Sequence, residues 1–88
     1  KHGKGKLTLT GGEIYDGEWR DDKKHGYGVY EDTESGEKYE GDWENDRRNG
    51  SGKYTYDNND EYNGAWLNDE RNGHGIYKFS DGDYYEGE

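Results

Sequence analysis

The sequence predicts an all-β protein, an elongated single-layer antiparallel sheet built from tandem β-hairpins. Three observations lead to this prediction: a repeat of about 23 residues, a period-two alternation inside each repeat, and no apolar spacing of the helical kind. A unit of this length cannot bury an apolar face alone, so successive hairpins are expected to pair edge to edge.

The first strand of each hairpin is predicted from the pattern Tyr-x-Gly-x-Trp, in which every second residue is aromatic or glycine. Complete copies occur at residues 15–19, 39–43 and 62–66, and the Tyr-x-Gly part recurs at Tyr85. The steps between the four tyrosines are 24, 23 and 23 residues. Alternation of this kind is typical of a half-buried strand.

The second strand is predicted from Gly-x-Gly, which always begins 11 residues after a complete Tyr-x-Gly-x-Trp motif starts. The six polar residues between the two motifs, such as 20–25 (RDDKKH), are expected to form a hairpin loop. The extra residue of the 24-residue step falls in the connection 31–38, which we therefore expect to be a loop as well. The strands are expected to be centred near Gly5, Gly17, Gly28, Gly41, Gly52, Gly64, Gly75 and Gly87.

Alternation also assigns the two faces of the sheet, and it places 12 of the 14 aromatic residues on the same face. Mostly charged and polar residues occupy the other face. The glycines leave hollows on the aromatic face, where a Cβ would collide with a ring. We expect a tryptophan ring to lie flat across the strands in each hollow.

Composition and charge restrict the classes of function. The net charge of −10 disfavours nonspecific binding to nucleic acid and to anionic membranes. Basic residues recur in the predicted hairpin loops (Lys23, Lys24, Arg47, Arg48 and Arg71) and would form a row along one rim, but acids in the same loops offset them. The chain has no cysteine and no long apolar run, which favours a cytoplasmic location and makes direct membrane binding an unfavourable hypothesis.

No catalytic, cofactor or metal site is predicted. The sequence has no cysteine nucleophile and no Ser-His-acid set at suggestive spacing, so we expect the chain not to be an enzyme. Residues 57–61 (DNNDE) begin like a calcium-binding EF-hand loop, but Tyr62 stands where that loop needs glycine and Asn68 where it needs glutamate. This segment is interpreted as a turn between repeats.

The segments 39–56 (YEGDWENDRRNGSGKYTY) and 62–79 (YNGAWLNDERNGHGIYKF) resemble MORN repeats, and the resemblance extends over essentially the whole chain. It implies partial repeats at 1–14 and 85–88, complete repeats at 15–38, 39–61 and 62–84, and an excerpt of a longer array. Departures are modest: Asn49 and Asn72 stand where His25 stands in its repeat, and Leu7 and Leu9 replace the tyrosines of the second strand. The residues that carry the repeat are Tyr15, Gly17, Trp19, Gly26, Gly28, Tyr39, Gly41, Trp43, Gly50, Gly52, Tyr62, Gly64, Trp66, Gly73 and Gly75.

The resemblance implies a non-enzymatic structural scaffold or protein–protein docking module. Family members of this kind occur in ciliary and axonemal assemblies, notably the radial spoke head, and this cytoskeletal context is the expectation here. The alternatives are a MORN array that regulates a lipid kinase or tethers a membrane-associated protein, and a secreted glycan-binding repeat. Choline-binding repeats of the last class usually place aromatic residues side by side, whereas here only Tyr84 and Tyr85 are adjacent.

An aromatic face of this size would exceed the apolar patches typical of soluble monomers. We therefore expect a partner helix, a peptide or another MORN sheet to cover part of it, although twist could also close the face on itself. The expected partner-binding residues are Tyr54, Tyr56, Tyr77 and Phe79, and the hydroxyls of the three tyrosines could bond a partner's backbone.

Overall fold

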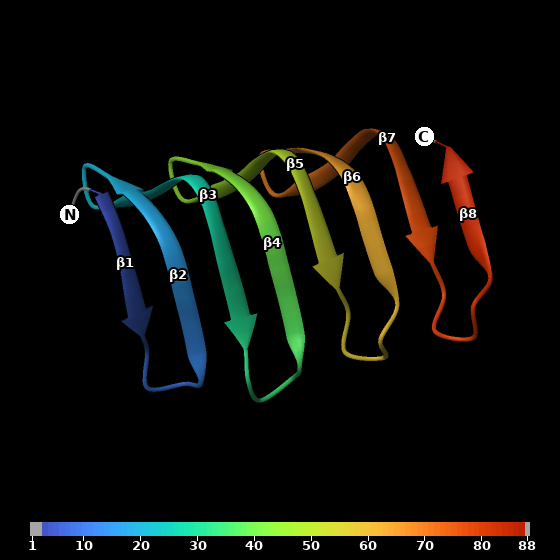
Figure 1. The fold of residues 1–88 in the computed structure, drawn as a ribbon, viewed down its shortest axis with the longest axis horizontal. Coiled ribbons are helices and arrows are strands. Elements are labelled where there is room, and N and C mark those ends of the chain that lie inside the picture. Colours follow the sequence, from blue (N-terminus) through green and yellow to red (C-terminus); the bar gives the residue numbers. More distant parts are fainter. Residues whose placement is uncertain (1–2, 88) are drawn as a thin grey trace.

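The computed structural model describes residues 3–87 and folds them into one antiparallel sheet of eight strands, in which each strand pairs with its neighbours in the sequence. Figure 1 shows the strands side by side in chain order, with the two ends of the chain at opposite ends of the array. The strands are β1 (Gly3–Thr8), β2 (Glu13–Arg20), β3 (Lys23–Asp32), β4 (Glu37–Glu44), β5 (Arg47–Thr55), β6 (Glu61–Leu67), β7 (Glu70–Lys78) and β8 (Tyr84–Gly87).

The predicted fold class is confirmed. The register of the strands also explains the glycine of Tyr-x-Gly-x-Trp and the second glycine of Gly-x-Gly. Every predicted strand centre lies inside a strand, and these eight glycines pair with one another in a continuous row from Gly5 to Gly87. A Cβ built on Gly41 would collide with the Cα of Gly52 across the strand pair. The row therefore has no room for side chains.

The prediction of six-residue hairpin loops between the two motifs is wrong. Strands β2 and β3 are joined by Asp21 and Asp22 alone, which have φ of 52° and 66°. The pairs at 45–46 and 68–69 have the same positive φ values at both positions. Two central residues with positive φ form a type I′ turn, the turn that matches strand twist, and Asp and Asn tolerate this conformation best after glycine. The polar residues on either side are consequently strand residues.

A bulge interrupts the pairing just before each of these turns, and it explains the first glycine of Gly-x-Gly. The register shifts between Gly17 and Trp19, and equivalent shifts occur in the next two hairpins. Gly26, Gly50 and Gly73 have φ of 75°, 113° and 73° at these bulges, a conformation that disfavours residues with a Cβ. A bulge also increases twist locally.

Longer loops connect the hairpins at the opposite edge of the sheet (Figure 1). Three of them, at 9–13, 56–60 and 79–83, share one pattern: the first N–H donates to the fifth carbonyl, and the fourth N–H donates to the first carbonyl. The loop between β3 and β4 differs, because Gly36 N–H donates to Asp32 carbonyl. The extra residue of the longest repeat lies in the connection 31–38, as predicted, but only 33–36 form the loop, because Glu31 pairs with Lys38 and Asp32 with Glu37.

The core lies on one face of the sheet, where Tyr15, Trp19, Tyr39, Trp43, Tyr62 and Trp66 are buried. The tyrosine, rather than the expected tryptophan, fills each glycine hollow: a Cβ on Gly52 would meet the ring and hydroxyl of Tyr39. The Tyr39 hydroxyl then donates a hydrogen bond to the Asp42 carbonyl at 2.8 Å. The tyrosine fits because its ring can run along its own strand and end at the bulge. The described residues contain no helix that could span a membrane.

Candidate functional site

The three tryptophans link successive hairpins. Trp43 Nε1 donates a hydrogen bond to the Gly28 carbonyl of the preceding hairpin at 3.1 Å, and Trp66 Nε1 donates to the Gly52 carbonyl at the same distance. Trp19 makes the equivalent bond to Gly5. The bond satisfies the buried indole donor and fixes the position of each hairpin relative to the one before it.

Edge-to-face ring contacts accompany these hydrogen bonds. Trp43 packs against Tyr15 of the preceding hairpin at 5.5 Å between centroids and against Tyr39 of its own hairpin at 5.1 Å. Trp66 repeats the arrangement with Tyr39 and Tyr62, both at 5.4 Å. Such contacts add about 0.5–1.5 kcal/mol each to the free energy gained from burial alone. The buried tyrosines and tryptophans therefore form a continuous frame rather than a binding surface.

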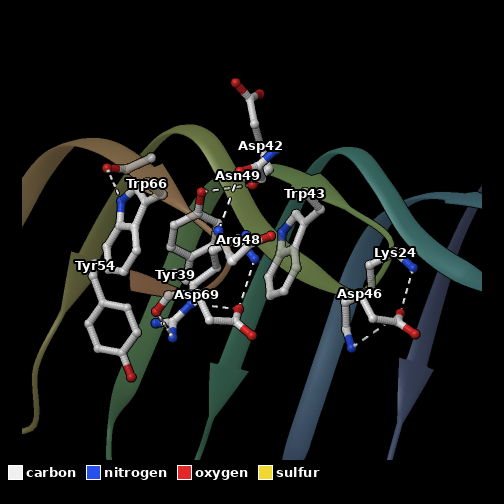
Figure 2. Close-up of polar contacts among 12 residues, drawn as sticks. Lys24, Tyr39, Asp42, Trp43, Asp46, Arg48, Asn49, Tyr54, Trp66 and Asp69 are labelled. Atoms are coloured by element: carbon white, nitrogen blue, oxygen red, sulfur yellow. Dashed lines mark hydrogen bonds and ion pairs between the residues drawn. The ribbon is translucent and has the colours of Figure 1, made fainter. Parts of the chain in front are cut away.

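Three of the five basic residues predicted to form a row of loop cations, Lys24, Arg48 and Arg71, lie on the aromatic face instead. Lys24 and Arg48 are strand residues, since the turns are shorter than expected, and Arg71 is placed equivalently. The guanidinium carbon of Arg48 lies 4.7 Å from the Trp66 ring centroid and 5.1 Å from that of Tyr54. Figure 2 shows Arg48 among these rings. These cations make cation–π contacts with rings of the aromatic face.

Aspartates of the type I′ turns complete this arrangement. Arg48 Nε lies 3.3 Å from Asp69 Oδ1, and the Arg48 backbone N–H donates to the same carboxylate oxygen at 2.9 Å. Lys24 and Asp46 repeat the pairing one hairpin earlier, as Figure 2 shows. Each turn is thereby attached to the preceding hairpin. Arg48 is in the same period-two alternation as Gly50 and Gly52. The sequence would therefore have placed it on this face if the hairpin loop had been predicted to be short.

The second-strand tyrosines are held by carboxylates that lie at, or just before, the start of the preceding strand. The hydroxyls of Tyr30, Tyr54 and Tyr77 donate hydrogen bonds to Glu13, Glu37 and Asp60 at 2.8, 2.9 and 2.8 Å. Burial, and next the hydrogen bond to the carboxylate, raises the pKa of Tyr30 and of Tyr54 to about 12. The hydroxyls of Tyr54 and Tyr77 therefore already donate within the sheet, contrary to the expectation that they would bond a partner's backbone.

Asp60 has a structural role in the segment that begins like a calcium loop. Its side chain is buried and accepts hydrogen bonds from the Tyr77 hydroxyl and from the Ser80 N–H, both at 2.8 Å. The hydrogen bond from Tyr77 is the main reason that the pKa of Asp60 is lowered. This carboxylate joins the loop after β5 to the loop after β7, which agrees with the interpretation of the segment as a turn between repeats.

The four predicted partner-binding residues lie together and form an aromatic strip, by which we mean Tyr54, Tyr56, Tyr77 and Phe79. Consecutive ring centroids in this order are 4.8, 5.7 and 4.9 Å apart. Tyr54, Tyr56 and Tyr77 are partly buried against the core, whereas Phe79 is 43% exposed. The strip thus runs across two hairpins and presents ring edges and faces to solvent.

Polar and hollow surfaces adjoin the aromatic strip. A hollow of about 450 Å³ lies beside Tyr54 and Tyr56, between Arg48 and Arg71. Asp57 follows Tyr56 directly, and Asp81 and Asp83 lie two and four residues after Phe79. All three are exposed loop residues. Within the part of the chain that the structure describes, the Tyr56 hydroxyl forms no hydrogen bond. The strip therefore combines apolar rings, one uncommitted hydroxyl and an acidic margin.

Comparison with known families gives one result, and it agrees with the repeat pattern. The model described as MORN repeat matches residues 1–14, 15–34, 39–61 and 62–84, which together make up most of the chain. A comparison with curated proteins gives no match.

Proposed function

The chain belongs to the MORN repeat family, whose repeats are non-catalytic interaction modules for scaffolds, and we propose that this chain docks a protein partner on its aromatic strip. One observation carries the proposal: the rings of Tyr54, Tyr56, Tyr77 and Phe79 form a continuous row, although the fold needs only some of them. Tyr56 and Phe79 lie at loop starts, where other copies have different residues.

The rest of the aromatic face supports this choice of surface. The frame tyrosines and tryptophans are buried, and they use their polar atoms on backbone carbonyls of the sheet. Lys24 and Arg48 are similarly engaged by rings and by aspartates. What these groups leave for a partner is the strip and its margin, a mixture of aromatic and polar surface that is enriched at interface hot spots.

A scaffold in a ciliary or axonemal assembly, such as the radial spoke head, is the cellular context that we propose for this docking. Its support is the family resemblance, together with the absence of cysteine, which agrees with a reducing compartment such as the cytoplasm. The alternative is an array that regulates a membrane-associated protein or a lipid kinase. The net charge of −10 and the engagement of Lys24 and Arg48 disfavour direct contact with an anionic lipid surface.

Affinity capture with matched variants tests the proposal. The double variant Tyr56→Ser/Phe79→Ser removes the two strip residues at the loop starts, and we expect it to recover at least tenfold less partner than the unchanged protein, as for the loss of two hot-spot aromatics. The control is Tyr27→Ser/Tyr84→Ser, which removes two aromatic residues that are 53% and 70% exposed and lie outside the strip. Equal losses in both variants, at unchanged β-type circular dichroism, would place docking elsewhere.

A further inference from the structure

We propose that the aromatic strip binds a proline-rich segment in the polyproline II conformation, with basic residues at one end. The inference rests on the proposed docking function and specifies its partner by chemistry. Three features of the strip point to it: the spacing of the repeat, the chemistry of the rings, and the charge of the margin.

The spacing of equivalent residues matches the pitch of polyproline II. Tyr54 on β5 and Tyr77 on β7 occupy equivalent positions two strands apart. Two strand spacings amount to about 9.6 Å, measured across the strands. A polyproline II helix advances about 9.3 Å in one turn of three residues. A ligand lying across the strands therefore places residues i and i+3 against Tyr54/Tyr56 and Tyr77/Phe79 in turn.

Other conformations fit this spacing less well. Two turns of an α-helix advance about 10.8 Å, which differs more from the single two-strand step of about 9.6 Å than one polyproline II turn does. An added β-strand would pair with the edge of a sheet, whereas the strip is on a face. The strip thus favours a ligand that repeats every three residues and needs no edge.

Ring geometry and hydrogen bonding agree with a proline ligand. Neighbouring rings in the strip are tilted by 44°, 31° and 55° and so do not form a flat stack, and a groove-like hollow lies beside Tyr54 and Tyr56. Aromatic-lined grooves of this kind recognise proline-rich peptides in other domains. The backbone carbonyls of polyproline II are unpaired, and the Tyr56 hydroxyl can donate to one of them. The hydroxyls of Tyr54 and Tyr77 fix ring orientation through Glu37 and Asp60.

Charge complementarity indicates that one end of the ligand is basic. Asp57, Asp81 and Asp83 are exposed in the loops that begin at Tyr56 and Phe79, and they form no ion pair with any other residue in the range 3–87. The two loops that carry Tyr56 and Phe79 are thus acidic. An arginine or lysine flanking the prolines would meet them, which fixes the direction of the ligand and favours encounter with a cationic segment.

A peptide titration followed by nuclear magnetic resonance tests the inference on the 88-residue chain. The probe is a synthetic peptide with prolines at i and i+3 and two terminal arginines. One matched peptide has the same composition with prolines at i and i+2, and another has glutamates in place of the arginines. We expect saturable shifts near Tyr56 and Phe79, with affinity lowered about tenfold by respacing, which is 1.4 kcal/mol, and several-fold by the charge change.

The variants of the chain complete the design. Tyr56→Ser/Phe79→Ser should abolish the shifts, and Tyr27→Ser/Tyr84→Ser should retain them. Equal affinity for the respaced peptide, or no saturable shift at millimolar concentration, overturns the polyproline assignment. Docking itself fails only if partner capture is also insensitive to Tyr56→Ser/Phe79→Ser. The two failures are therefore distinguishable.

Discussion

The second strands of the hairpins make the same frame contacts in both halves of the sheet, but different residues stand at their ends. In β5 and β7 the second-strand tyrosine is followed two residues later by another aromatic residue, giving Tyr54–Tyr56 and Tyr77–Phe79. In β3 the corresponding pair is Tyr30–Asp32, and in the first repeat it is Leu7–Leu9. The frame contacts beneath are nevertheless alike, since Tyr30 and Tyr54 are both held by a glutamate. The difference therefore concerns the surface and not the fold.

This contrast separates two kinds of residue in a repeat protein. Positions that recur in every copy, such as the glycine row and the buried tyrosines, build the sheet. Positions that vary among the copies are free to carry a specific interaction. The aromatic strip arises where two neighbouring copies both have an aromatic residue at such a position, so the proposed docking surface lies in the C-terminal half of the array.

A second contrast concerns the bulges. In the first two hairpins a carboxylate caps the bulge: Glu18 accepts the Tyr27 N–H at 3.0 Å, and Asp42 accepts the Ser51 N–H at 3.1 Å. In the third hairpin Ala65 stands at the equivalent position and offers no acceptor. The hairpin closest to Phe79 thus lacks a stabilising contact that the other two have.

The largest expected effect concerns the frame, which should be equally important in both halves. Trp43→Ala removes a buried indole with its ring contacts and its hydrogen bond to Gly28, and we expect a loss of about 3–5 kcal/mol in the free energy of unfolding. Trp66→Ala should cost a similar amount. Glu40→Ala, on the other face, should cost less than about 0.5 kcal/mol. Denaturant titration measures all three, and similar losses for Trp43→Ala and Glu40→Ala would contradict the face assignment.

Smaller effects are expected at the bulges, where the two contrasting regions can be exchanged. Asp42→Ala should destabilise the chain by about 1 kcal/mol, and Ala65→Asp should stabilise it by about 0.5–1 kcal/mol, because each change removes or adds one acceptor for a strand N–H. Ala65→Val adds side-chain volume without adding an acceptor. It therefore separates the effect of the bulge cap from the effect of strand propensity. Thermal or denaturant unfolding gives the three values. No gain from Ala65→Asp beyond that of Ala65→Val would rule out the capping explanation.

A further effect should come from alkaline pH and should be alike in both halves. The pKa of Tyr30 and of Tyr54 is raised to about 12 in the folded chain, against about 10 when unfolded. The protonated tyrosines therefore contribute their full stability below pH 10, and the contribution is lost as pH rises from about 10 toward 12. Urea unfolding at pH 8, 10 and 11 should show this decline. Tyr30→Phe/Tyr54→Phe should reduce the decline, and an unchanged slope would show that other groups cause it.

Much of the fold follows from the sequence because its alternation is strict. The period of two places the strands, the faces and the spare loop residue. The turn length was missed, since a run such as RDDKKH has strand and turn residues of equal polarity. The signal was the Asp-Asp or Asn-Asp pair in each run, which tolerates the two positive φ values of a type I′ turn.

Only part of the candidate site could be predicted from the sequence. Phase alone put Tyr54, Tyr56, Tyr77 and Phe79 on one face, but it gave no distances and no indication that two hydroxyls are already engaged. The glycine hollows were also foreseen, yet composition cannot decide whether tyrosine or tryptophan fills them. That choice depends on the length of the ring along its strand and on the carbonyl available at the bulge.

Site-specific photocrosslinking tests the central claim most directly, namely that docking occurs where two neighbouring repeats carry aromatic residues at a position that varies among the copies. A photoreactive phenylalanine analogue is placed at Phe79 in one protein and at Tyr27 in another, each expressed in cells of the native type. Both positions are exposed, at 43% and 53%, but only the first belongs to the aromatic strip. We predict a discrete crosslinked protein from position 79 and none from position 27. The same adduct at both positions, or an adduct at position 27 alone, would contradict the account.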